Sequence, residues 1–102
     1  MEFPHQFIHH VYFWLHDASA APELVAGLRT LVPIPGIRTA HIGIPASTSR
    51  DVIDSSYDVS WVAVFDDKAS QDAYQEDPVH LAFVEACSGL WKRVVVYDSV
   101  PV

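Results

Sequence analysis

The sequence predicts a single α+β domain whose four strands form one antiparallel sheet with helices on one side. Three observations lead to this prediction. Large apolar residues recur at every second position in strand-like segments, leucines recur at helical spacing after the first of these segments, and Asp and Pro residues mark helix starts. The resulting order of elements is strand, helix, strand, strand, helix, strand.

The first strand extends from Gln6 to His16, where β-branched and aromatic side chains dominate. Its two faces follow from alternation. One face holds Phe7, His9, Val11, Phe13 and Leu15, and the other holds Ile8, His10, Tyr12, Trp14 and His16. Because both faces carry large apolar groups, we expect a central strand that is covered on both sides.

The first helix follows directly. Asp17 and Ser19 are typical start signals, and Pro22 suits a first helical turn. The apolar stripe of this helix consists of leucines four and three residues apart, which are Leu24, Leu28 and Leu31. Two prolines soon after the stripe end the helix.

A weaker strand and a long loop come next. The segment from Gly36 to Ile44 is rich in β-branched residues and is closed by a proline, which is typical of a short or edge strand. The polar segment from Ala46 to Ser56 is predicted to be an exposed loop, longer than most connections in compact domains.

The second half repeats the strand, helix and strand pattern. Tyr57 to Phe65 alternates between bulky and small side chains, as expected of a strand. Asp66 or Asp67 then begins a helix that runs to about Gln75, and Asp77 with Pro78 begins a further helix that continues to about Ser88. The segment from Trp91 to Val100 is the last strand.

This order is the ferredoxin-like βαββαβ arrangement, with the helices packed on one face of a four-stranded antiparallel sheet. The other face is left apolar and uncovered. Two copies packed face to face about a two-fold axis would bury it, so we expect a homodimer through the sheet face that forms a dimeric α/β barrel.

Composition narrows the function. The 102 residues suit one domain, 1–102, and the formal charge of −7, with no cluster of Lys and Arg, argues against nucleic acid and anionic membranes as partners. No apolar run approaches a membrane span, and the first ten residues do not resemble a signal peptide. The single cysteine, Cys87, favours a reducing compartment, so we expect a cytoplasmic protein.

Four short segments resemble one known family. They are His10 with the apolar strand after it, Tyr57-Asp58-Val59, and Val96-Tyr97-Asp98, and the segment from Ala73 to Val84 is the most specific. The resemblance covers Phe7 to about Ser99 and is to the stress-responsive α/β-barrel (Dabb) family. It implies the dimeric fold. The family also includes plant polyketide cyclases that use a tyrosine and a histidine at the positions matching Tyr74 and His80.

Tyr74 and His80 are therefore the candidate catalytic residues. His80 falls near the third position of its helix, where the positive end of the helix dipole favours the neutral imidazole that can act as a base. Tyr74 would donate a hydrogen bond to an oxygen on which charge develops. In the other interpretation, His80 caps or orients its own turn and Tyr74 packs in the core.

His10 is the third candidate, because it resembles a histidine near the start of the first strand in the cyclase-like members and would orient a ligand. The interpretation as a core or interface histidine stays open. The neighbouring His9 has less claim, since it lies on the other face. A ligand-contact set follows from the same face as His10, and it comprises His10, Tyr12, Trp14, Ser60 and Val62. Alternation alone does not decide which face meets the helices.

We expect neither a metal nor an organic cofactor. The six histidines, His5 among them, show none of the short ligand spacings of zinc sites, and the chain has no phosphate-binding glycine loop. Two functions compete. The first is a cofactor-free cyclase or lyase acting on a polyketide-like or other small carbonyl compound, and the second is a non-catalytic stress-responsive dimer that binds a small apolar ligand or is purely structural.

Overall fold

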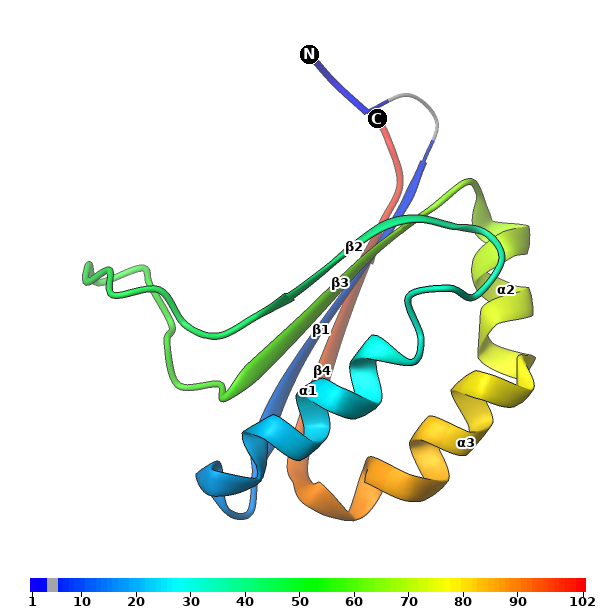
Figure 1. The fold of residues 1–102 in the computed structure, drawn as a ribbon. Helices are drawn as coiled ribbons and strands as arrows, with labels where there is room; N and C mark the ends of the chain where they lie inside the picture. The colour runs from blue at the N-terminus through cyan, green and yellow to red at the C-terminus, as the bar shows by residue number, and fades with distance from the viewer. Residues whose placement is uncertain (4–5) are drawn as a thin grey trace.

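The computed structural model describes residues 1–3 and 6–102, so His5 lies outside the described residues. A four-stranded sheet forms one layer and three α-helices form the other (Figure 1). The strands are β1 (Phe7–Leu15), β2 (Ile37–Gly43), β3 (Val59–Phe65) and β4 (Trp91–Ser99), and the helices are α1 (Ala21–Arg29), α2 (Lys68–Glu76) and α3 (Pro78–Cys87). The predicted ferredoxin-like α+β fold is confirmed.

The sheet has the strand order β2-β3-β1-β4, and all neighbours are antiparallel. β1 is the central strand, as predicted: Val11 pairs with Trp61 of β3 on one side and with Val96 of β4 on the other. β2 lies at one edge, which agrees with its weak alternation and its closing proline. β4 forms the other edge.

Side-chain caps explain where the helices begin. Asp17 caps a short 3-10 turn, Ala18–Ala20, and α1 begins only after that turn, at Ala21. The Asp67 carboxylate accepts a hydrogen bond of 2.8 Å from the Ser70 backbone N–H and so begins α2. Asp77 does the same for α3 through the Val79 N–H, at 2.8 Å. The chain therefore turns sharply between α2 and α3, and residues on either side of the turn come together.

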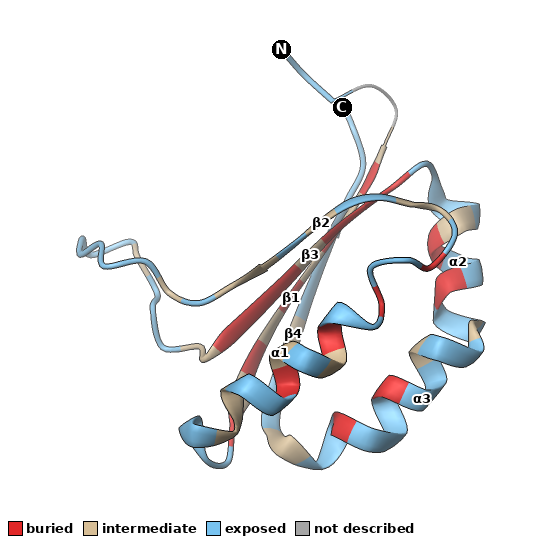
Figure 2. Ribbon diagram, in the orientation of Figure 1, coloured by how far each residue is buried: buried red, intermediate tan, exposed pale blue. Residues whose placement is uncertain are grey.

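Burial identifies the face of the sheet that meets the helices (Figure 2). Phe7, Val11, Phe13 and Leu15 of β1 are buried beneath the helices, together with the leucine stripe of α1 and the bulky face of β3. The alternate residues of β1 are only partly buried. The expectation that β1 is covered on both sides therefore holds for one side of a single chain, because none of the helices that the structure describes covers the other side (Figure 2).

The connection between β2 and β3 is a long loop that projects beyond the sheet (Figure 1), as predicted. β3 begins at Val59 and not at Tyr57. Asp58 still bonds to β1, because its N–H donates to the Phe13 carbonyl at 2.8 Å and its carboxylate accepts from the Leu15 N–H at 2.7 Å. The Asp58 carboxylate therefore replaces a backbone carbonyl in the next hydrogen bond between the two strands. Of the helices that the structure describes, none is long and apolar enough to cross a membrane.

Candidate functional site

The predicted site residues divide between the two faces of the sheet. Tyr74 and His80 lie on the helix side, where they come together. His10, Tyr12, Trp14 and Val62 lie on the open side, and so does Ser60, since His10 pairs with Val62 and Tyr12 pairs with Ser60 across β1 and β3. The structure therefore does not bring His10 to Tyr74 and His80, because the sheet lies between them.

A cavity of about 280 Å³ lies between the sheet and the helices, and we call it the inner cavity. Its polar lining consists of His9, Trp61, Tyr74, Gln75 and His80. The rest of its wall is apolar and comes from β1, β4, α1 and α3. Three lining valines are partly exposed, with exposed fractions of 37% for Val84, 41% for Val94 and 47% for Val96. The mouth of the cavity is therefore apolar and lies between α3 and β4.

Tyr74 is held in the inner cavity by α2, and only 2% of its surface is exposed. Its ring packs against the Phe65 ring at 5.0 Å and against the His80 imidazole at 4.5 Å between centroids. Burial raises the pKa of Tyr74 to about 12, while the nearby Trp61 N–H acts in the opposite direction. The hydroxyl is therefore protonated at neutral pH and is available as a hydrogen-bond donor.

His80 is the third residue of α3 and is half-buried at the cavity wall. Its Nδ1 lies 3.2 Å from the Gln75 carbonyl oxygen. Because a carbonyl only accepts, Nδ1 carries the proton in this contact and Nε2 keeps a free lone pair. The bond also holds the turn between α2 and α3 in place. His80 can therefore orient its own turn through Nδ1 and still offer Nε2 as a base.

The pKa of His80 is lowered, mainly by burial and to a smaller extent by His9, while the bond to the Gln75 carbonyl and the charge of Asp77 oppose the shift. The sequence argument predicted neutral imidazole from the helix dipole. The direction is the same, but burial is the main cause. A neutral imidazole whose Nε2 is free has the form that a general base needs.

His9 is the residue that the sequence argument underrated. It lies on the inner face of β1 with 5% of its surface exposed, and its Nδ1 is 2.6 Å from the Asp98 carboxylate of β4. Its ring lies 5.9 Å from the Tyr74 ring. The signal was present in the alternation, because His9 shares its face with Phe7 and Val11, and that face is the core.

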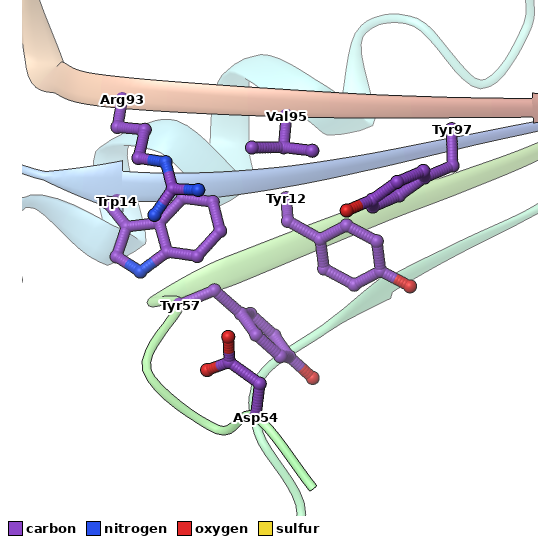
Figure 3. A pocket seen from close by; sticks show the side chains of 7 residues that line it. All are labelled: Tyr12, Trp14, Asp54, Tyr57, Arg93, Val95 and Tyr97. Atoms are coloured by element: carbon purple, nitrogen blue, oxygen red, sulfur yellow. The ribbon is translucent and has the colours of Figure 1, made fainter. Parts of the chain in front are cut away.

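The open face of the sheet carries a second hollow, of about 380 Å³, which we call the outer hollow (Figure 3). Arg93 of β4 stacks 4.4 Å above the Trp14 ring, and the Trp14 indole N–H donates to the Ser56 hydroxyl at 3.0 Å. Hydrogen bonds from Ser56 also lower the pKa of Asp54 at its rim. The rings of Tyr12, Tyr57 and Tyr97 and the side chain of Val95 form the rest of its lining. Trp14, Asp54 and Arg93 thus already have partners.

Metal-ligating side chains do not gather in the part of the chain that the structure describes: no three His, Cys, Asp or Glu residues there lie close enough together to hold an ion. The thiol of Cys87 is buried beneath α1, and burial raises its pKa. It is therefore a packing residue, as its place in the helix pattern suggests.

Solved structures from several organisms have the same fold as this chain. A Dabb family protein with a ferredoxin-like fold from Mesorhizobium loti is 26% identical, with a TM-score of 0.77, over 97% of this chain and 99% of that one. A dimeric ferredoxin-like protein from Thermobifida fusca is 21% identical, with a TM-score of 0.74, over 99% and 96%. A hydroxynitrile lyase from Passiflora edulis is 16% identical, with a TM-score of 0.78, over 98% and 96%.

No curated protein sequence matches this chain. The family described as the stress responsive A/B barrel domain matches residues 7–101, which is almost the whole chain. The chain therefore belongs to the stress responsive A/B barrel (Dabb) family.

Proposed function

We propose that the protein binds a small carbonyl compound in the inner cavity and removes a proton from it, with His80 as the base and Tyr74 as the hydrogen-bond donor. The observation that supports this most directly is the contact between the Tyr74 and His80 rings, 4.5 Å apart, at the wall of a cavity of about 280 Å³. One neutral donor and one neutral base thus face the same apolar space.

The proposed step uses the protonation state of both groups. His80 Nε2 takes a proton from the carbon next to the carbonyl, the C–H electron pair forms a carbon–carbon double bond, and the former carbonyl oxygen becomes an enolate oxygen. The Tyr74 hydroxyl stabilises that oxygen. The enolate carbon then attacks a second carbonyl of the same molecule, and the new alkoxide takes the proton back from His80. This is an aldol-type cyclisation, and it requires no cofactor.

The reverse of this reaction, in which a carbon–carbon bond is broken, is a lyase reaction. His80 takes the proton of a hydroxyl, the adjacent carbon–carbon bond breaks, a carbonyl forms, and the leaving carbanion takes a proton from the imidazolium. The Passiflora protein, a hydroxynitrile lyase by name, has this fold. That likeness is one of fold alone, so the support for either sense comes from the side chains of the inner cavity.

His9 and Asp98 form the floor of the proposed site. The short contact between them, at 2.6 Å, fixes the His9 ring beneath Tyr74. We assign His9 a positioning role, because its ring packs against the phenol ring of Tyr74.

We also propose that two copies pair through the open sheet face. The outward residues His10, Tyr12, Trp14, Ser60 and Val62 belong to this interface in the proposal, in place of the ligand contacts expected from the sequence. Tyr97 on the same face is 63% exposed, which is costly for a large aromatic ring in a monomer. Proteins of this fold from Thermobifida fusca and Bacteroides fragilis are dimeric, which supports a homodimer.

A non-catalytic binding domain is the second candidate. The apolar mouth of the inner cavity and the engagement of His80 Nδ1 by its own backbone favour it. In this case the same cavity holds an apolar ligand and no proton is removed.

Deuterium exchange separates the two candidates. A panel of small aryl methyl ketones is incubated with the protein in D₂O, and exchange of the methyl protons is followed by NMR. Catalysis predicts exchange that His80→Ala abolishes while the fold is retained. Protection of the protein against thermal unfolding by a ketone, with no exchange, would support the binding domain instead.

A further inference from the structure

Trp61 occupies the centre of the inner cavity wall. It lies in the middle of β3, pairs with Val11 of β1 and with Ile42 of β2, and has only 1% of its surface exposed. Its indole Nε1 is buried and makes no hydrogen bond. Within residues 1–3 and 6–102, it is the only buried side-chain nitrogen or oxygen without a partner. The burial of Trp61 on the inner face of β3 is that of a packing residue, but packing does not explain an unpaired donor.

A buried donor without an acceptor is destabilising, so such groups mark places where a partner is missing or where geometry changes on binding. The Tyr74 phenol oxygen is a suitable acceptor in the same cavity. Trp61 and Tyr74 line the same cavity, and the Trp61 N–H opposes the effect of burial on the Tyr74 pKa, yet the two groups form no hydrogen bond. A hydrogen bond between the two groups would give the Trp61 N–H its missing partner.

We propose that Trp61 is a positioning residue: on ligand binding its indole N–H donates to the Tyr74 phenol oxygen and so directs the Tyr74 hydroxyl proton at the oxygen of the ligand. This inference rests on the proposed function of the inner cavity. Tyr74 is the residue that touches the ligand, and Trp61 acts through it.

The direction follows from the chemistry of the two groups. An indole N–H only donates, whereas a phenol both donates and accepts. Once Trp61 occupies a lone pair of the phenol oxygen, the phenol proton must be donated elsewhere, and the ligand is the remaining acceptor in the cavity. A bond received by the phenol oxygen also strengthens the bond that its proton makes, because consecutive hydrogen bonds polarise one another. Catalytic hydrogen bonds are often long before the ligand arrives and shorten when it binds.

This role of Trp61 narrows the ligand class. The ligand should have an oxygen that accepts a strong hydrogen bond and gains negative charge, and the rest of it should be apolar to match the mouth of the cavity.

4-Nitrophenol is a suitable probe, because it has one aromatic ring and its phenolate absorbs visible light. Affinity and the apparent pKa of the bound probe are measured by absorbance titration for wild type, Trp61→Phe, Tyr74→Phe and the double variant. Trp14→Phe makes the same chemical change on the opposite face of the sheet and measures the general effect of losing an indole.

We expect Trp61→Phe to weaken phenolate binding about 10-fold, because the loss of the Trp61 bond weakens the hydrogen bond from Tyr74 to the charged probe. The apparent pKa of the bound probe should rise for the same reason. We expect no further effect of Trp61→Phe in the Tyr74→Phe background, because Trp61 acts only through the tyrosine. An equal effect in both backgrounds, or none in either, would contradict the inference. Loss of binding in Tyr74→Phe alone would keep the proposed function and reject the role of Trp61. If wild type does not bind the probe, both proposals fail.

A second measurement needs no change at Trp61. In protein labelled with ¹⁵N at tryptophan, the indole N–H signal of Trp61 should move to lower field when 4-nitrophenol binds to wild type and should stay in place in Tyr74→Phe. A shift of the same size in both proteins would show that the indole does not act through the tyrosine.

Discussion

The inner cavity and the outer hollow lie on opposite faces of the same sheet, and β1 supplies residues to both by strict alternation. The inner cavity holds buried groups whose pKa values are shifted, namely Tyr74 and His80, together with the unpaired Trp61 N–H. In the outer hollow, Trp14 and Asp54 already have partners. Shifted and unpaired groups are typical of reactive sites, so the smaller and less conspicuous space is the better candidate.

His9 and His10 show this difference in a single step along the chain. His9 points into the core and touches Asp98 and Tyr74, whereas His10 points to the open face. Two neighbouring histidines of one strand therefore belong to two different surfaces. If chemistry and assembly divide between the faces in the same way, substitutions on the two faces will have different effects.

The largest expected effect concerns catalysis. His80→Ala should reduce ketone exchange by about 100- to 10,000-fold, the usual contribution of a positioned base. His10→Ala, the matched histidine change on the other face, should reduce it by no more than a few-fold. Exchange rates by NMR, with circular dichroism to check folding, provide the comparison. A larger loss in His10→Ala than in His80→Ala would place the chemistry on the open face.

The next effect concerns assembly. Val62→Asp places a carboxylate on the open face of β3. In the proposed dimer, two such carboxylates would be buried at the interface. Because a buried, unpaired charge is strongly destabilising, we expect the dimer dissociation constant to rise about 100-fold or more. Sedimentation at a series of concentrations measures it. If the variant stays as tightly associated as wild type, the open face is not the interface.

A smaller effect is expected at the floor of the inner cavity. Asp98→Asn weakens the contact to His9, and we expect the free energy of unfolding to fall by about 1 kcal/mol, since the carboxylate is partly exposed. Asp54→Asn is the control on the rim of the outer hollow, where the change should be smaller. Denaturant unfolding curves give both values, and equal losses would remove the distinction between the two sites.

The smallest effect concerns pH. Burial lowers the pKa of His80 below its ordinary value of 6.5, so the unfolded chain takes up a proton at a higher pH than the folded protein does. Stability is therefore expected to fall as the pH drops from 6.5 toward the lowered pKa of the folded state, and to be unaffected by this group above 6.5. Thermal midpoints of wild type and His80→Gln at several pH values test this. A wild-type curve parallel to that of His80→Gln would exclude the effect.

The fold could be read from the sequence because several local signals agree. The alternation in β1 and β3, the leucine stripe of α1 and the caps Asp67 and Asp77 each predict the element that the structure contains. Tyr74 and His80 could be named as a pair, and the turn at Asp77 and Pro78 explains why residues six positions apart meet.

The site as a whole could not be read in the same way. Both faces of β1 carry large apolar groups, so alternation assigns residues to two sets without telling which set faces the helices. The prediction that His10 orients the ligand on which Tyr74 and His80 act depended on that choice. Trp61 was equally hidden, because an indole that only packs and an indole with an unpaired N–H have the same pattern in a sequence.

A crystal structure of wild type with bound 4-nitrophenol tests the central claim most directly, since it shows which face of the sheet receives the ligand. The account predicts the probe in the inner cavity, with its oxygen within hydrogen-bond distance of the Tyr74 hydroxyl and its ring toward Val94 and Val96. A probe found only in the outer hollow, against Tyr12 and Trp14, would contradict the account and would move the site to the open face.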